Sequence, residues 1–150
     1  MHPIEIQNVT KDFGQGRGVF DISFSVKEGE VFGYLGPNGA GKSTTIRQLL
    51  GFVKPQKGTL RMLGMDCFRQ AAQIHKHIGY LAGEIAFVEN MKGMEYIHFI
   101  AHLRGMRDNT RMKELIDMFE LNSAGKIRKM SKGMKQKIAL LTAFTDSTKG

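Results

Sequence analysis

The chain has 150 residues, of which 41% are hydrophobic, and its 22 lysines and arginines against 14 acidic residues give a formal net charge of +8 at pH 7. This length and composition exclude a disordered tail and suit one domain with a core, or one core with a small subdomain. The single cysteine, Cys67, cannot form an internal disulfide, which favours a reducing, cytosolic setting. No apolar stretch reaches the roughly 20 residues of a membrane span, and residues 1–5 lack the regions of a signal peptide.

Residues 4–35 contain three predicted strands. Residues 4–9 and 20–26 alternate apolar and polar side chains, which is typical of strands with one face exposed to water. Residues 31–35 form a continuous apolar run, which predicts a strand covered on both faces. The apolar face of the second strand would consist of Phe20, Ile22, Phe24 and Val26.

The glycine-rich segment 36–44 follows this apolar run and fits the pattern G-x-x-x-x-G-K-[ST] of a phosphate-binding P-loop between a strand and a helix. Its glycines let several backbone N–H groups converge on one anion, and the positive end of the following helix favours phosphate at the same point. Lys42 would reach the β- and γ-phosphates, and the Ser43 hydroxyl would ligate Mg²⁺. The predicted nucleotide-binding residues of this segment are Gly36, Pro37, Asn38, Gly39, Ala40, Gly41, Lys42, Ser43 and Thr44.

The remaining residues predict one more stretch of strands and then a helical region. Met112, Leu115, Ile116 and Phe119 recur with the spacing of one helix face, and Ser131 has the properties of an N-cap. The predicted strands are 59–63 and 77–81, and the predicted helices are 68–76, 89–104, about 109–120 and a final helix after Ser131. Together these elements indicate an α/β layer with an antiparallel flank.

A second motif lies at the start of the final helix and, together with the P-loop, resembles the nucleotide-binding domain of ABC transporters. The resemblance extends from Ile4 to about Phe144. It implies an α/β P-loop NTPase fold of the ABC ATPase type, with an antiparallel β flank and a helical subdomain. The segment that matches the S-x-G-M-x-Q variant of the family signature consists of Ser131, Lys132, Gly133, Met134, Lys135 and Gln136.

The resemblance also implies ligands and partners. Taken alone, Phe13 would be interpreted as a core aromatic, but in the family the aromatic at this place stacks on adenine. The expected cofactors are ATP and Mg²⁺. Two such domains would pair head to tail around ATP and act on a separate transmembrane permease, which places the chain in the cytoplasm at the inner face of the membrane.

The sequence departs from the family at two places. Gly83 stands where the family has a glutamine that helps to bind Mg²⁺, so Glu84 is the candidate replacement ligand. The family's Asp-Glu strand and switch histidine are absent, so we assign no catalytic base and expect ATP binding with poor hydrolysis. The expected domains are an ATP-binding core over 1–82 and a helical subdomain with the signature over 83–144, and the fold is C-terminally incomplete with a truncated tail over 145–150.

Several other functions remain open. The net charge of +8 is the argument for a soluble ABC-type ATPase that acts on ribosomes or nucleic acid. Its basic residues are scattered outside 126–137, which favours a solvated basic surface instead. A different P-loop class, a GTPase or a kinase, is a second alternative, and a GTPase is disfavoured because the chain has no N-K-x-D motif. The last alternative is a truncated fragment that does not hydrolyse ATP.

Overall fold

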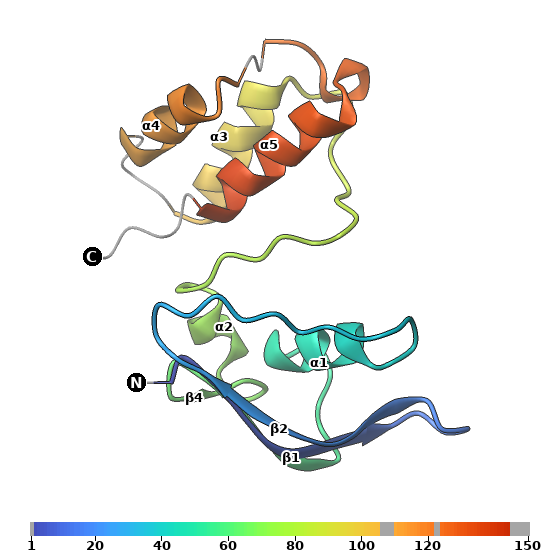
Figure 1. The fold of residues 1–150 in the computed structure, drawn as a ribbon. Helices are drawn as coiled ribbons and strands as arrows, with labels where there is room; N and C mark the ends of the chain where they lie inside the picture. Colours follow the sequence, from blue (N-terminus) through green and yellow to red (C-terminus); the bar gives the residue numbers. More distant parts are fainter. Residues whose placement is uncertain (1, 106–109, 122–123, 145–150) are drawn as a thin grey trace. The chain divides into compact units, whose positions relative to one another are not determined.

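The computed structural model describes residues 2–105, 110–121 and 124–144. The chain divides into two compact units, residues 1–75 and residues 76–150. The first unit holds the strands and two helices, and the second holds the remaining helices (Figure 1). The structure thus confirms the antiparallel flank and the helical region. The domain boundary expected after residue 82 stays a prediction.

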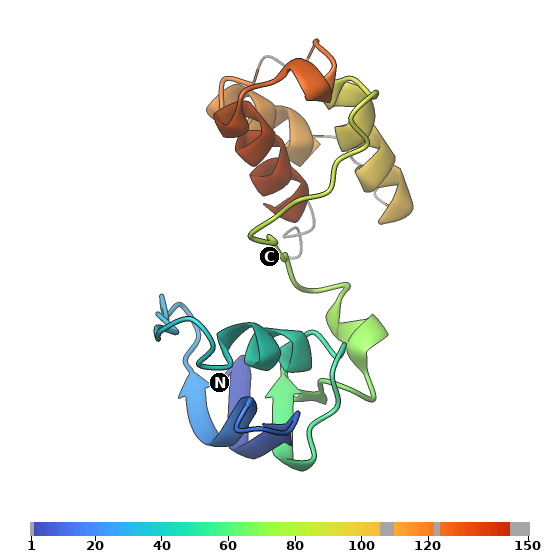
Figure 2. The ribbon, with the colours of Figure 1, turned by 90° about the vertical axis from the view of Figure 1, so that its right-hand side faces the viewer.

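The first unit is built on a four-stranded antiparallel sheet with the strand order β2-β1-β3-β4. Helix α1, Lys42–Leu49, contacts β2 and β3 and lies against one face of this sheet (Figure 2). The strands are β1 (Ile4–Asp12), β2 (Gly18–Val26), β3 (Lys57–Met62) and β4 (Met65–Asp66).

The β1–β2 pair confirms two predicted strands but not the simple alternation of the second. Val19 is buried and Phe20 is 48% exposed, the reverse of the predicted pattern at the start of β2. Asp21 has a left-handed φ of 50°, and the register shifts between Val9 and Lys11 of the facing strand. Such an irregularity reverses the faces to which the side chains before it point. The residues of β2 that precede Asp21 therefore face the opposite side of the sheet from the predicted one.

The predicted buried strands at 31–35 and 77–81 are wrong. Neither segment pairs with another strand within the described residues, and Val31 and Leu35 are 100% and 91% exposed. A parallel strand pairs with strands that are distant in the sequence. An apolar run therefore does not reveal whether those partner strands are present. What holds residues 31–35 near the sheet is aromatic packing: the Phe24 ring lies 4.9 Å from that of Phe32 and 5.2 Å from that of Tyr34.

Helix α2 spans Ala71–Ile74 and is much shorter than the predicted helix 68–76. Just before the helix, Asp66 Oδ1 accepts the backbone N–H groups of Phe68 and Arg69 at 3.0 and 2.8 Å. These bonds hold the chain in a turn ahead of the helix.

The second unit packs its helices around a common apolar cluster. Buried Ile97, Met112 and Leu141 come from three different helices, and partly buried Ile116 and Phe119 pack against them, as the predicted face requires. Helix α3 begins at Gly93 rather than Glu89, because residues 89–92 pair their backbone with residues 126–128. The elements are α3 (Gly93–Leu103), α4 (Thr110–Met118), the 3₁₀ turn η1 (Ile127–Lys129) and α5 (Lys132–Phe144).

Candidate phosphate-binding site

The P-loop turns into α1 through two glycines in the left-handed conformation. Gly39 has a φ of 85° and Gly41 a φ of 84°, which other residues adopt only with strain. Gly41 is the N-cap of α1, and no side chain caps this helix. The backbone N–H groups of its first turn therefore remain available to an acceptor, and the helix dipole makes an anion the favoured one.

The Lys42 side chain folds back over the loop that precedes it. Its ammonium donates hydrogen bonds to the carbonyl oxygens of Gly36 at 2.5 Å and Pro37 at 2.7 Å. Ala40 N–H also donates to the Pro37 carbonyl, at 3.2 Å, and closes the turn from the other side. The lysine charge thus lies at the loop itself, within the segment predicted to bind phosphate.

Close packing behind the loop fixes its position. A methyl group at Gly41 would overlap Val19 Cγ1 and the Gly18 carbonyl oxygen at the start of β2. On the helix, buried Thr45 bonds the Gly41 carbonyl through its hydroxyl at 3.3 Å and shares a 3.2 Å hydrogen bond with the Tyr34 hydroxyl. The sequence analysis missed Thr45 and Tyr34, although a threonine four residues after the N-cap is the signal for this bond.

Phe13 directly follows β1, and its side chain is 52% exposed. Its N–H donates to the Arg17 carbonyl at 2.9 Å in the hairpin that leads to Gly18, the residue against which Gly41 packs. Lys11 Nζ lies 5.4 Å from the centre of the Phe13 ring. Phe13 is therefore an exposed aromatic on the hairpin next to the P-loop rather than a core residue.

The residues of this site fit a magnesium-bound triphosphate. The glycine turn and the uncapped start of α1 supply amide donors, Lys42 supplies a cation, and the exposed Ser43 supplies a hydroxyl oxygen. Among the described residues, no group of three or more His, Cys, Asp or Glu side chains is placed to hold a metal ion. Mg²⁺ commonly uses phosphate oxygens and water with one or two protein oxygens, so it does not need such a group.

The signature segment opens α5 in the second unit. Ser131 Oγ accepts the N–H of Met134 at 3.2 Å, which confirms the predicted N-cap, and its carbonyl accepts the N–H of Lys135 at 3.0 Å. Ser131 and Gly133 are exposed, whereas Met134 packs on the apolar cluster.

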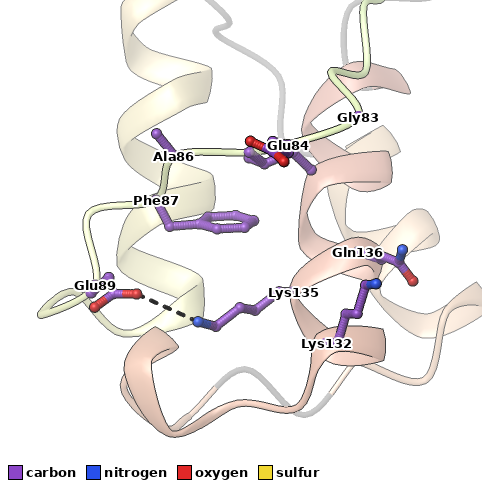
Figure 3. A pocket seen from close by; sticks show the side chains of 9 residues that line it. Gly83, Glu84, Ala86, Phe87, Glu89, Lys132, Lys135 and Gln136 are labelled. Atoms are coloured by element: carbon purple, nitrogen blue, oxygen red, sulfur yellow. Dashed lines mark ion pairs between the residues drawn. The ribbon is translucent and has the colours of Figure 1, made fainter. Parts of the chain in front are cut away.

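A pocket of about 570 Å³ lies beside the signature segment (Figure 3). Lys132 and Gln136 project from α5 on one side of it, and Glu84 and Phe87 lie on the chain segment opposite. Lys135 Nζ and Glu89 Oε1 are 3.6 Å apart. The structure places Glu84 in this pocket, in the unit that does not contain the P-loop, so its role as a magnesium ligand stays a prediction.

A family model described as ABC transporter matches residues 19–149. The chain is 34% identical over 142 residues to the probable multidrug ABC transporter ATP-binding protein YbhF of Escherichia coli, a match that covers 91% of this chain and 25% of that protein. It is 32% identical over 143 residues to the bacitracin transport ATP-binding protein BcrA of Bacillus licheniformis, covering 94% of this chain and 47% of that protein. The chain thus spans half the length of these curated relatives or less.

Solved structures agree with this result. The ATP-binding subunit of an ABC transporter matches with a TM-score of 0.81 and 25% identity, covering 94% of this chain and 61% of that chain. A dimeric ATP-binding cassette in a post-hydrolysis state, bound to ADP and Pi, matches in fold with a TM-score of 0.77 and 22% identity, covering 95% of this chain and 69% of that chain. The family model spans most of the sequence and the solved structures share its P-loop fold, so the chain belongs to the ABC transporter family and has the fold of its ATP-binding domains.

Proposed function

We propose that this chain binds MgATP at residues 36–44 and is the ATP-binding part of an ABC transporter subunit that acts on a separate membrane permease. The observation that carries this proposal is the left-handed glycine turn that delivers Lys42 to an uncapped helix start. The relatives YbhF and BcrA, named for multidrug and bacitracin transport, support the transporter role. Among the described residues no helix has the length and apolar character needed to cross a membrane.

Each residue of the site has a defined task in this proposal. The amide groups of the loop and of the first turn of α1 bind the phosphate oxygens. Lys42 exchanges its two carbonyl acceptors for phosphate oxygens, and the Ser43 hydroxyl ligates the metal. Bound Mg²⁺ neutralises charge on the β- and γ-phosphates. The exposed ring of Phe13 stacks on the adenine.

The signature segment completes the proposal through a second copy of the domain. The exposed Ser131 hydroxyl and the amide of Gly133 stand at the start of α5, where an anion is favoured. Two domains arranged head to tail would bring these groups to the nucleotide held by the partner copy. The Glu84 carboxylate belongs to the same proposal as an oxygen ligand to Mg²⁺.

Isothermal titration calorimetry of the full chain with MgATP tests the phosphate site. Each charge-assisted hydrogen bond contributes about 1.5–3 kcal/mol, so Lys42→Ala should weaken binding at least about tenfold. The matched control is Lys57→Ala, which removes the same charge from an exposed position on β3 and should leave the affinity unchanged. Wild-type affinity in Lys42→Ala would refute the assigned role.

The metal is tested by repeating the titration with Ser43→Ala. The variant should lose affinity for MgATP while its affinity for ATP in EDTA remains close to that of the wild type, because the hydroxyl acts on the metal. An equal loss in both titrations would contradict the assignment of Ser43 to Mg²⁺.

A further inference from the structure

The backbone next to Phe13 is held by a side chain from a distant part of the chain. Gln56 Oε1 accepts the N–H of Asp12 at 2.7 Å, and Gln56 Nε2 donates to the Asp12 carbonyl at 3.3 Å, two bonds that span 44 residues of sequence. The backbone N–H of Gln56 also donates to the Thr10 carbonyl at 2.9 Å. Gln56 therefore attaches the end of β1 to the segment that precedes β3.

The side chain of Gln56 takes the place of a peptide group in the sheet. Backbone pairing of β3 with β1 reaches Lys57, which lies opposite Thr10. Continuing this register would set Pro55 opposite Asp12, and proline has no N–H to donate. A primary amide has both an acceptor oxygen and an N–H donor, so it can pair with both backbone groups of Asp12. Gln56 thus extends the pairing of the two strands beyond the point at which backbone pairing stops.

The backbone on both sides of Phe13 is fixed, although the Phe13 ring is 52% exposed. Asp12 pairs with Gly18 of β2, and Asp12 Oδ1 accepts the Gly14 N–H at 2.7 Å. The N–H of Phe13 itself donates to the Arg17 carbonyl at 2.9 Å. All three successive N–H groups therefore have a partner. An exposed ring on such a backbone is preorganised for a flat ligand, because little conformational freedom remains to be lost on binding.

Lys11 covers one face of the Phe13 ring. Its Nζ lies over the ring at 5.4 Å from the ring centre, within the range of a cation–π contact, and within the described residues no ion pair engages this ammonium. In the sheet Lys11 lies opposite Val19, the residue that a methyl group at Gly41 would overlap. A lysine on one face holds the ring in one orientation and leaves the other face to a ligand.

We propose that Gln56 and Lys11 are positioning residues for the base of the nucleotide. Gln56 fixes the backbone that carries Phe13, and Lys11 occupies one face of the ring, so that the adenine stacks on the opposite face. This inference rests on the proposed function, which assigns the base to Phe13 and the phosphates to residues 36–44. Because both residues act through the ring, they contribute only to the binding of ligands that carry a base.

Calorimetry of the full chain with two probes tests the proposal. The probes are MgATP and magnesium tripolyphosphate, which has the phosphates without the base, and the readout is the ratio of their affinities. Gln56→Met keeps a similar volume without the amide and should weaken MgATP binding about threefold to tenfold. Lys11→Met keeps the apolar stem without the charge, and its selective effect on MgATP should be about twofold to fivefold. A general loss of stability or of positive charge would lower both affinities together and leave their ratio unchanged.

Control variants separate positioning from other effects. Gln7→Met makes the same substitution at an exposed position of β1 and should keep the wild-type ratio. Lys11→Arg retains a cation for the ring and should keep it as well. In a Phe13→Ala background, neither Gln56→Met nor Lys11→Met should change the ratio further, because the group through which they act is gone.

The possible failures are distinguishable. A wild-type ratio in Gln56→Met or in Lys11→Met would overturn the role of that residue, although both probes bind and the phosphate site stands. An equal loss of both affinities in Lys11→Met would assign this lysine to the phosphates instead of the ring. A wild-type chain that binds neither probe would refute the proposed phosphate site, and this inference with it.

Discussion

Replacing Gly41 and Gly39 by alanine separates backbone strain from steric overlap within one loop. The two glycines have almost the same φ, 84° and 85°, so each alanine carries the same left-handed strain of about 1–2 kcal/mol. A methyl group at Gly39 meets nothing within 4 Å, whereas one at Gly41 overlaps Val19 Cγ1 and the Gly18 carbonyl. Overpacking of this kind adds about 1–3 kcal/mol, because Val19 is buried and protein interiors are closely packed.

The expected loss of unfolding free energy is therefore about 1–2 kcal/mol for Gly39→Ala and about 2–5 kcal/mol for Gly41→Ala. Hydrogen exchange of the slowest amides in β1 and β3 measures both values in the full chain. In a Val19→Ala background the difference between the two alanines should shrink, because one of the two overlapping groups is gone. Equal destabilisation by the two alanines in the wild-type background would refute the packing argument.

Three further predictions concern other parts of the chain. Phe13→Ala should weaken MgATP binding by about 1–3 kcal/mol, and unchanged affinity by calorimetry would count against stacking. Ser131→Ala removes the bond to the Met134 N–H and should lower protection of the α5 amides by about 1 kcal/mol in hydrogen exchange; unaltered protection would mean that the cap contributes nothing. Burial raises the pKa of the Cys67 thiol from 9.0 to about 11, so the unfolded chain loses this proton first and stability should fall between pH 9 and 11. Urea unfolding of the wild type and of Cys67→Ala over this pH range measures the fall in stability. The same pH dependence in both proteins would contradict the prediction.

Local sequence patterns predicted the parts of the fold that depend on neighbouring residues. The start of α1 at Lys42 follows from the glycine turn, and the N-cap at Ser131 follows from a serine that precedes an apolar period. The buried positions Met112 and Leu115 follow from the helix period alone. In each case the interacting groups lie within a few residues of one another.

The errors share a different physical origin. Residues 31–35 have the composition of a buried strand, but their pairing depends on distant segments. Phe20 is exposed and Val19 is buried because the left-handed residue Asp21 shifts the strand register at this point. The alternation of apolar and polar residues in the sequence does not reveal such a shift. Gln48 was not singled out as buried, because its environment comes from β3 and the turns around it.

The two hydrogen bonds that Lys42 makes within the loop affect how much it would contribute to the proposed nucleotide binding. Its ammonium already bonds two carbonyl oxygens of the loop, so in the proposed MgATP complex it would exchange these acceptors for phosphate oxygens rather than form new bonds from a solvated state. The carbonyls of Gly36 and Pro37 then lose a donor, although the Ala40 N–H still bonds Pro37. The net gain comes from replacing neutral acceptors by charged ones, and charge-assisted bonds are roughly twice as strong as neutral ones. Under the proposed function, Lys42 therefore stabilises the loop in the absence of nucleotide and the phosphates in its presence.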